Sequence, residues 1–235
     1  MSEQEEEKII SGCVTCKAYD KCFASMLSKA ELAEFEKELT SVVAKHDEVI
    51  FSENKHANKI YVLLEGDVKL EHKNALEQPV IMRIAHCCES MGLETMLSER
   101  HYLMTAVAVT DAVCCAIPKS NIENFVVRNK AACSKLMEQM QNEQERIYKH
   151  SLLMISGSSE SKLAQALLSL SNKAGVVRIS KEDIALMTGL TRETISRILS
   201  RMNSKKIIET KQREVIILNR TELEKLTGNM KHNSD

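Results

Sequence analysis

Three cysteines near the start of the chain could hold one metal centre. Cys13, Cys16 and Cys22 follow the spacing C-x2-C-x5-C. Because the chain between them is short, three thiolates spaced in this way can wrap around one centre, and a fourth ligand must come from elsewhere in the chain. The residues alone leave three interpretations open: an iron–sulfur cluster, a tetrahedral zinc site, and reduced thiols that bind no metal.

The other cysteines supply the candidates for the fourth ligand. They are Cys87, Cys88, Cys114, Cys115 and Cys133. We expect residues 103–117 to be a strand, and successive side chains of a strand point to opposite faces. Only one of Cys114 and Cys115 should therefore face the N-terminal cysteines. A free cysteine is often simply a buried side chain, which is our interpretation of Cys133 and of one member of each adjacent pair.

A second group of functional side chains lies near the C-terminus. Ser180 and Thr191 are candidate N-caps of two short helices that are separated by Gly189, which is the helix-turn-helix pattern. The second helix has an apolar stripe that can pack on the first helix. The stripe consists of Ile195, Ile198, Leu199 and Met202. The opposite, polar face consists of Arg192, Glu193, Ser196, Arg197 and Ser200.

The polar face carries residue types that suit contact with DNA. Arg can bind guanine O6 and N7, Glu can accept a hydrogen bond from cytosine N4, and Ser accommodates several bases. Lys205 and Lys206 follow the helix and suit phosphates, and residues 215–218 predict the second strand of a β-wing. The alternative is that Glu193 and Arg197 form an i,i+4 ion pair on a solvated helix surface. The face, the turn, the wing and the local charge together favour DNA.

The charge distribution agrees with a nucleic-acid-binding end. The chain has 235 residues and a net charge of −1, but residues 161–220 hold twelve Lys or Arg and five Asp or Glu, a net charge of +7. An acidic body with a basic C-terminal segment is typical of a module that binds a polyanion.

The sequence shows no sign of export or of a membrane span. Its first eight residues are acidic, and no apolar run approaches the roughly 20 residues that a spanning helix needs. We therefore expect a cytoplasmic protein without a membrane partner, in a compartment that keeps its 8 cysteines reduced.

The elements that must position these residues follow a simple order. A helix is predicted over residues 27–39, and short β-type runs between residues 42 and 118 predict a small barrel or sandwich. Gly66 predicts a tight hairpin turn. A long helix is predicted over residues 131–155, and Gly157 begins the best linker candidate.

Three segments together resemble the CRP/FNR superfamily of transcription regulators, and specifically its FNR branch. They are the cysteine arm over residues 13–22, the segment 113–118 with its Cys114-Cys115 pair, and the segment 189–197. The resemblance implies an α+β fold with an N-terminal β-roll of the cyclic-nucleotide-binding, jelly-roll type, a long dimerisation helix and a C-terminal winged helix-turn-helix. We place the arm at 1–24, the β-roll sensor domain at 25–130, the dimerisation helix at 131–157 and the DNA-binding domain at 158–235.

The resemblance also implies a cofactor and partners. The FNR branch holds a 4Fe-4S cluster on three arm cysteines and one β-roll cysteine, which matches Cys115 here, with Cys114 as the alternate fourth ligand. Glu193, Ser196 and Arg197 match the residues that read half-sites related to TTGAT in an inverted repeat. The implied partners are palindromic double-stranded DNA, RNA polymerase and a second copy of the chain, for which the expected contacts are Met137, Met140 and Ile147.

The chain departs from the family pattern at three places. Leu103-Met104 stand where the cyclic-nucleotide branch has a phosphate-binding Arg-Ser or Arg-Thr pair, so a cyclic-nucleotide ligand is disfavoured. Ile147 stands where the oxygen sensor of the family carries an acid, which should ease pairing of the helices. The Cys87-Cys88 pair is not part of the pattern.

The sequence therefore predicts a regulator rather than an enzyme, with dimerisation and DNA binding controlled by a cluster that oxygen or nitric oxide damages. One alternative is a regulator of the same fold that has no cluster and senses redox state through thiols or zinc. The alternatives for the cofactor itself are a 2Fe-2S cluster, zinc or none. The alternative from another class is an iron–sulfur enzyme or electron carrier. The sequence contains no substrate-site motif and no Gly-rich phosphate loop that would support it.

Overall fold

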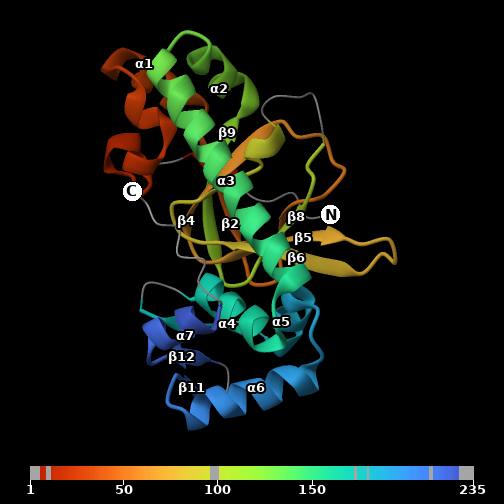
Figure 1. The fold of residues 1–235 in the computed structure, drawn as a ribbon. Coiled ribbons are helices and arrows are strands. Elements are labelled where there is room, and N and C mark those ends of the chain that lie inside the picture. Colours follow the sequence, from red (N-terminus) through yellow and green to blue (C-terminus); the bar gives the residue numbers. More distant parts are fainter. Residues whose placement is uncertain are drawn as a thin grey trace. The chain divides into compact units, whose positions relative to one another are not determined.

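The computed structural model describes residues 6–8, 12–95, 101–171, 174–178, 180–211 and 214–227 (Figure 1). The chain divides into two compact units, one of residues 1–72 and 84–145 and one of residues 73–83 and 146–235. None of the described helices combines the length and the apolar character needed to cross a membrane. The domain limits expected from the sequence stay predictions.

Two antiparallel sheets form the sandwich of the sensor region (Figure 1). The first sheet has the order β1 (Glu6–Lys8), β2 (Thr40–Ala44), β9 (Ala112–Pro118), β4 (Lys59–Glu65) and β7 (Ser90–Met91). The second has the order β3 (Val49–Phe51), β8 (Thr105–Ala108), β5 (Val68–Lys73) and β6 (Pro79–Ala85). The predicted α+β fold with an N-terminal β-roll is confirmed.

Short helical segments cover the outer face of the β4–β9 sheet. The N-terminal segments are the 3₁₀ turns η1 (Cys13–Thr15), η2 (Tyr19–Lys21) and η3 (Phe23–Met26), followed by α1 (Lys29–Phe35) and η4 (Glu36–Glu38). The later segments are α2 (Lys119–Val126) and the long α3 (Lys130–Ser156). We call residues 12–28 the arm. A 3₁₀ turn η5 (Leu93–Thr95) follows β7.

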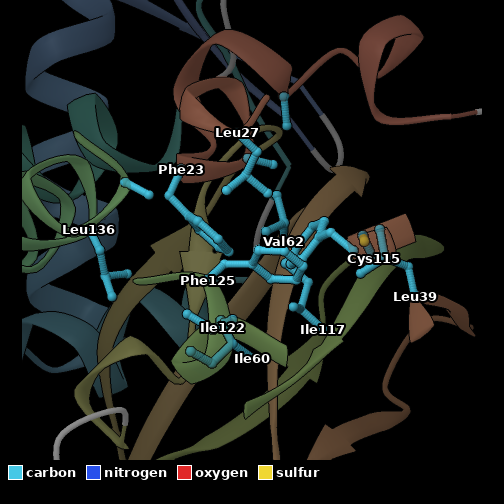
Figure 2. Close-up of a cluster of buried hydrophobic side chains, with 14 of the residues drawn as sticks. Phe23, Leu27, Leu39, Ile60, Val62, Cys115, Ile117, Ile122, Phe125 and Leu136 are labelled. Atoms are coloured by element: carbon cyan, nitrogen blue, oxygen red, sulfur yellow. The ribbon is translucent and has the colours of Figure 1, made fainter. Parts of the chain in front are cut away.

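The arm, α1, α2 and the sheet share one apolar core. Members of this core labelled in Figure 2 are Phe23, Leu27, Leu39, Ile60, Val62, Cys115, Ile117, Ile122, Phe125 and Leu136. At its centre, Phe35 is fully buried and meets Phe23 and Phe125 edge to face, with ring centroids 5.4 and 5.7 Å apart. Such pairs stabilise a core beyond the area that they bury.

The predicted helix over residues 27–39 is confirmed in place but is shorter than expected. Ser28 caps α1 through a capping box with Glu31, and the last turn tightens into η4. A capping box satisfies two backbone N–H groups at once, which explains why the helix begins there.

Two predictions about the strands are wrong. Gly66 has the expected positive φ of +86°, but β4 pairs with β9 and β7 while β5 pairs with β8, so the turn joins two sheets rather than closing a hairpin. A Cβ at Gly66 would lie 2.3 Å from the backbone oxygen of Asp111. The expected strand over 103–117 is two strands in different sheets, separated at Thr110, whose hydroxyl accepts the backbone N–H of Asp67.

The second unit contains the helix-turn-helix. Its elements are α4 (Ser159–Leu170), β10 (Val176–Val177), α5 (Lys181–Thr188), α6 (Arg192–Ser204), β11 (Ile208–Thr210), β12 (Val215–Ile217) and α7 (Arg220–Leu226). The three strands form a sheet with the order β10-β12-β11, which confirms the predicted wing. Leu163, Leu167 and Ile195 are fully buried and tie α4 to α6 in one core.

We predict that Phe35→Ala lowers the free energy of unfolding by about 3–5 kcal/mol, because it removes a buried ring and leaves a cavity between two others. Urea denaturation followed by circular dichroism measures this change. Leu76→Ala is the control: its side chain is 76% exposed, so we expect a change within about 0.5 kcal/mol. Equal effects of both substitutions would contradict this account of the core.

Candidate metal centre and nucleic-acid interface

Four cysteines line one apolar cavity between the arm and the outer face of the β4–β9 sheet. The cavity has a volume of about 30 Å³, and its sulfur-bearing residues are Cys13, Cys16, Cys22 and Cys115. The rest of the lining is aliphatic or aromatic, and the lining residues carry no carboxylate or imidazole. Figure 2 places Cys115 at the edge of the apolar core, close to Leu39 and Val62.

The local fold of the arm explains why its three cysteines converge. Cys16 N–H donates to the carbonyl oxygen of Cys13 at 2.9 Å, which closes η1, and side chains three residues apart share one side of a 3₁₀ turn. Cys22 lies between η2 and η3, where its N–H donates to Ala18 at 2.9 Å. The backbone N–H of Cys13 also donates to the Glu36 carboxylate, which ties the arm to η4.

The strand β9 separates the two adjacent cysteines as the sequence predicts. Cys115 lies opposite Ser41 of β2 and Val62 of β4, belongs to the core shared with the arm, and lines the cavity. Cys114 is fully buried and is neither part of that core nor of the cavity lining. Strand alternation therefore brings Cys115, and not Cys114, to the arm.

The thiols of this cavity influence one another electrostatically. Burial raises the pKa of Cys13 to about 12, with further contributions from the Glu36 carboxylate and from Cys22 and Cys16. Burial raises the pKa of Cys22 to about 11. Burial and then the charges of Cys13, Cys22 and Cys16 raise the pKa of Cys115 above its usual range. Four thiolates in this cavity would repel one another, so they require a cationic group between them.

The donor set, four thiols without a carboxylate or imidazole, fits a group held by thiolates. Among the described residues, no three His, Cys, Asp or Glu side chains are arranged to hold one metal ion. Four thiolates around one zinc ion lie only about 3.8 Å apart, given Zn–S bonds of about 2.3 Å and tetrahedral geometry. A 4Fe-4S cluster would take one thiolate from each of four cysteines, which is the donor set that this cavity offers.

The helix-turn-helix forms through the caps that the sequence predicts. The Ser180 hydroxyl accepts the N–H of Asp183 at 3.0 Å, and the Thr191 hydroxyl accepts the N–H of Thr194 at 3.2 Å. Gly189 ends α5 with a φ of +68°. The predicted apolar stripe of α6 is buried throughout. These contacts fix α6 by its apolar face and leave its polar face outward.

The polar face of α6 is exposed but not uniformly free. A guanidinium nitrogen of Arg192 pairs with Glu182 at 2.7 Å, and Lys181 Nζ donates to the Ser196 hydroxyl at 3.2 Å. The Ser200 hydroxyl donates back to the Ser196 carbonyl oxygen. The remaining predicted DNA contacts are exposed, and they are Glu193, Arg197, Lys205 and Lys206.

The alternative reading of α6 required an ion pair between Glu193 and Arg197. Within the part of the chain that the structure describes, neither side chain has an ion-pair partner. Their charges remain available to a ligand, which is the condition that direct reading of bases requires.

Two family models match this chain. The cyclic nucleotide-binding domain family matches residues 41–129, and the Crp-like helix-turn-helix domain family matches residues 161–226. The chain belongs to the CRP/FNR family. It is accordingly a DNA-binding transcription regulator and not an enzyme. Regulators of this family bind DNA and act as homodimers.

Individual relatives are distant but similar over most of their length. The transcriptional regulatory protein btr of Bordetella pertussis is 29% identical over 180 residues, which cover 72% of this chain and 73% of btr. The fumarate and nitrate reduction regulatory protein of Vibrio cholerae is 24% identical over 227 residues, covering 92% of this chain and 90% of that protein. The structure of FixK2 from Bradyrhizobium japonicum has a TM-score of 0.73 and 25% identity, covering 80% of this chain and 96% of that one.

The long helix of this CRP/FNR regulator presents apolar side chains in two directions. Met137 is 65% exposed, whereas Met140 packs against the core that α3 shares with the arm, and Ile147 is half-buried. Tyr148 and Ile155 are also exposed, and their helical spacing from Met137 puts all three on one face. The sequence predicts Met137, Met140 and Ile147 as dimer contacts and does not single out Tyr148 or Ile155.

Aromatic side chains pack together inside the nucleotide-type sandwich of this family member. Tyr102 is buried and stacks on Phe51 with ring centroids 4.2 Å apart, and its hydroxyl donates to the Lys59 carbonyl oxygen at 2.7 Å. Leu103 is exposed and Met104 is buried. These are the two apolar residues that the sequence matches to the phosphate-binding pair of the cyclic-nucleotide branch. Exclusion of cyclic nucleotides stays a prediction.

We predict that Gly189→Ala destabilises the helix-turn-helix by about 1 kcal/mol, because an L-residue disfavours φ of +68°. Among the described residues, no atom beyond the chain neighbours of Gly189 lies within 4 Å of the added Cβ, so we expect a purely conformational effect. Gly189→Asn is the matched control, since Asn tolerates this region better. Thermal unfolding of the full chain measures both variants, and an Ala variant as stable as Gly189 would contradict the assignment of this cap.

Proposed function

We propose that this chain is a regulator whose arm holds a 4Fe-4S cluster on Cys13, Cys16, Cys22 and Cys115, and whose cluster controls dimerisation and DNA binding. The observation that carries the proposal is the cavity in which these four residues, and no other titratable group except Tyr19, line an apolar space. Bound there, a cluster supplies a group that oxygen or nitric oxide can destroy. Cys114 is the less suitable ligand, because it lies outside this cavity.

The arm can pass its state to α3 through direct contacts. The Gln139 side chain donates a hydrogen bond to the carbonyl oxygen of Lys21 in η2. The Asn129 side chain, just before α3, donates to the carbonyl oxygen of Met26 at 3.1 Å. Leu136 and Met140 pack against the apolar core of the arm. A cluster that fixes the arm therefore also fixes the first turns of α3.

A fixed α3 favours pairing with a second copy of the chain. Met137, Tyr148 and Ile155 supply exposed apolar surface along one face of the helix, and Ile147 adds a half-buried contact without a charge. Burial of this face against its symmetric equivalent gives an isologous dimer. Without a group bound by its three cysteines, the arm would keep only its hydrogen bonds and apolar contacts, the start of α3 would be held less firmly, and the pair would be weaker.

A dimer presents two α6 helices to an inverted repeat. Glu193, Ser196 and Arg197 read bases of a half-site related to TTGAT, while Arg192, Ser200, Lys205 and Lys206 position the helix on the backbone. The half-sites lie roughly 34–36 Å apart, one turn of DNA. RNA polymerase is the further partner that a cytoplasmic regulator of this kind engages.

The relatives support the signal that we propose. The names include a fumarate and nitrate reduction regulatory protein in Vibrio cholerae and an anaerobic regulatory protein in Bacillus subtilis. The second candidate is a regulator of the same fold that senses redox state through thiols or holds zinc. The C-x2-C-x5-C spacing of the arm and the names of the relatives favour a cluster over a single zinc ion.

We predict that Cys115→Ser and Cys16→Ala, purified without oxygen, lose both the brown colour and binding to the palindrome. Cys114→Ser is the matched control and should keep both, because its side chain lies away from the cavity. Visible spectra with iron, sulfide and zinc analysis, before and after exposure to air, measure the outcome. Stoichiometric zinc without iron would support the second candidate, and cluster-free binding by Cys16→Ala at full strength would refute the mechanism.

We predict that Glu193→Ala and Arg197→Ala each weaken binding to a TTGAT palindrome by about 1–3 kcal/mol and relax the preference at one base pair. Lys205→Ala should weaken binding to all sequences alike and reduce the salt slope by about 1, because it removes a phosphate contact. Fluorescence anisotropy on palindromes with single base changes, at several salt concentrations, tests this. Lys29→Ala, an exposed charge on α1, is the control.

A further inference from the structure

A second pair of thiols lies on a tight turn next to the arm. The turn over residues 86–89 is closed by the N–H of Glu89, which donates to the carbonyl oxygen of His86 at 3.1 Å, and Cys87 and Cys88 are its central residues. Cys88 has a φ of +71°, which is unusual for a residue other than glycine. The N–H of Cys88 donates to the carbonyl oxygen of Leu63 at 2.7 Å, and the N–H of Leu63 donates to Glu89 at 2.9 Å. Bonds to β4 thus hold the turn in this conformation.

The turn brings both sulfurs together and keeps them accessible. Cys87 Sγ and Cys88 Sγ are 3.3 Å apart, Cys87 is exposed, and Cys88 is half-buried. Cys87 Sγ donates to the carbonyl oxygen of Leu64 at 3.0 Å, and Cys88 Sγ donates to the carbonyl oxygen of Lys17 at 3.3 Å. Leu64 belongs to β4 and Lys17 to the arm. The pair is absent from the cavity of the four other cysteines.

The distance between the sulfurs suits chelation better than a disulfide. A disulfide needs the sulfurs to close to about 2.05 Å, and its Cα atoms usually lie roughly 4.4–6.8 Å apart, whereas adjacent residues hold them at about 3.8 Å. Two thiolates on one tetrahedral ion lie about 3.8 Å apart, so only a small opening is required. The distance between the two sulfurs of the reduced pair is therefore already close to the distance between two thiolates on one bound ion.

We propose that Cys87 and Cys88 form a chelating dithiol for a thiophilic metal ion or metalloid compound, such as a trivalent arsenical. With an arylarsenoxide, two As–S bonds form, the As–O bond breaks, and the two thiol protons leave with the oxygen as one water. Neither arsenic nor sulfur changes its oxidation state. The dithiol is a site separate from the four cysteines of the cavity, and its binding does not depend on the function proposed above.

Binding at the dithiol affects the arm because it removes the thiol proton of Cys88. Chelation removes the S–H groups that donate to Lys17 and Leu64, and a sulfur without its proton then faces the Lys17 carbonyl oxygen. Two electron-rich atoms in that position repel each other, so the arm loses one of its attachments between Cys16 and Cys22. The consequence for DNA binding, unlike binding itself, rests on the proposed role of the arm.

Phenylarsine oxide tests the site, because it prefers dithiols over single thiols. Intact-mass spectrometry of the full chain, with glutathione in excess, counts the adducts on the wild type and on variants. Cys87→Ser and Cys88→Ser should each lose the same single adduct, since the advantage of a second ligand is on the order of 10²-fold or more. Cys133→Ser should keep this adduct. Cys16→Ala should also keep it and should lose only an adduct that the arm cysteines bind. Unchanged adduct counts in both Cys87→Ser and Cys88→Ser would overturn the proposal.

Limited trypsin digestion tests the link to the arm. Cleavage after Lys17 and Lys21 should accelerate in the wild type when phenylarsine oxide is bound and should stay unchanged in Cys87→Ser. An adduct on the wild type without faster cleavage would overturn the coupling. Neither measurement needs a cluster, so a chain that takes the adduct but never shows brown colour would refute the cluster and leave the dithiol site standing.

Discussion

The whole sensor region depends on a sheet that is apolar on both faces. Ile60, Tyr61, Val62 and Leu63 follow one another in β4, and all four are buried. Since alternate residues of a strand face opposite sides, one pair needs the sandwich interior and the other pair needs a separate cover. The arm, α1, α2 and the start of α3 provide that cover. The arm is therefore part of the hydrophobic core, and the cysteines that it carries are held at the sheet by the same burial that stabilises the domain.

Three of the contacts that hold the arm have a common form. Three carbonyl oxygens of its backbone, at Lys17, Lys21 and Met26, each accept a hydrogen bond from a side chain of another element. The donors are Cys88 from a turn, Gln139 from α3 and Asn129 from the segment before it. Because these hydrogen bonds are made to backbone carbonyl oxygens, they depend on the position of the arm and only weakly on its side chains. A change in arm position is thereby felt at three separate places.

The sequence predicted the features that depend only on neighbouring residues. The caps at Ser180 and Thr191, the left-handed Gly189 and the apolar stripe of α6 depend on neighbouring residues only, and each is present. The opposite directions of Cys114 and Cys115 follow from strand alternation alone. Strand partners were not predictable in this way, because β4 pairs with β9 across about fifty residues, and no pattern near Gly66 states which sheet comes next. Similarly, only tertiary packing directs Met140 toward the arm while Met137 stays exposed.

The 3₁₀ turns of the arm bear on how fast such a regulator can respond. Each of η1, η2 and η3 spans three or four residues and is closed by i→i+3 bonds, a length that cannot sustain helical structure without its packing partners. Opening free energies within one native protein range from near zero to the global value, and short segments of this kind lie toward the low end. Opening of the arm alone would leave the strand pairings of both sheets in place. In the regulator that we propose, the lifetime of the docked arm, rather than the stability of the sensor domain, would then set the pace of the response.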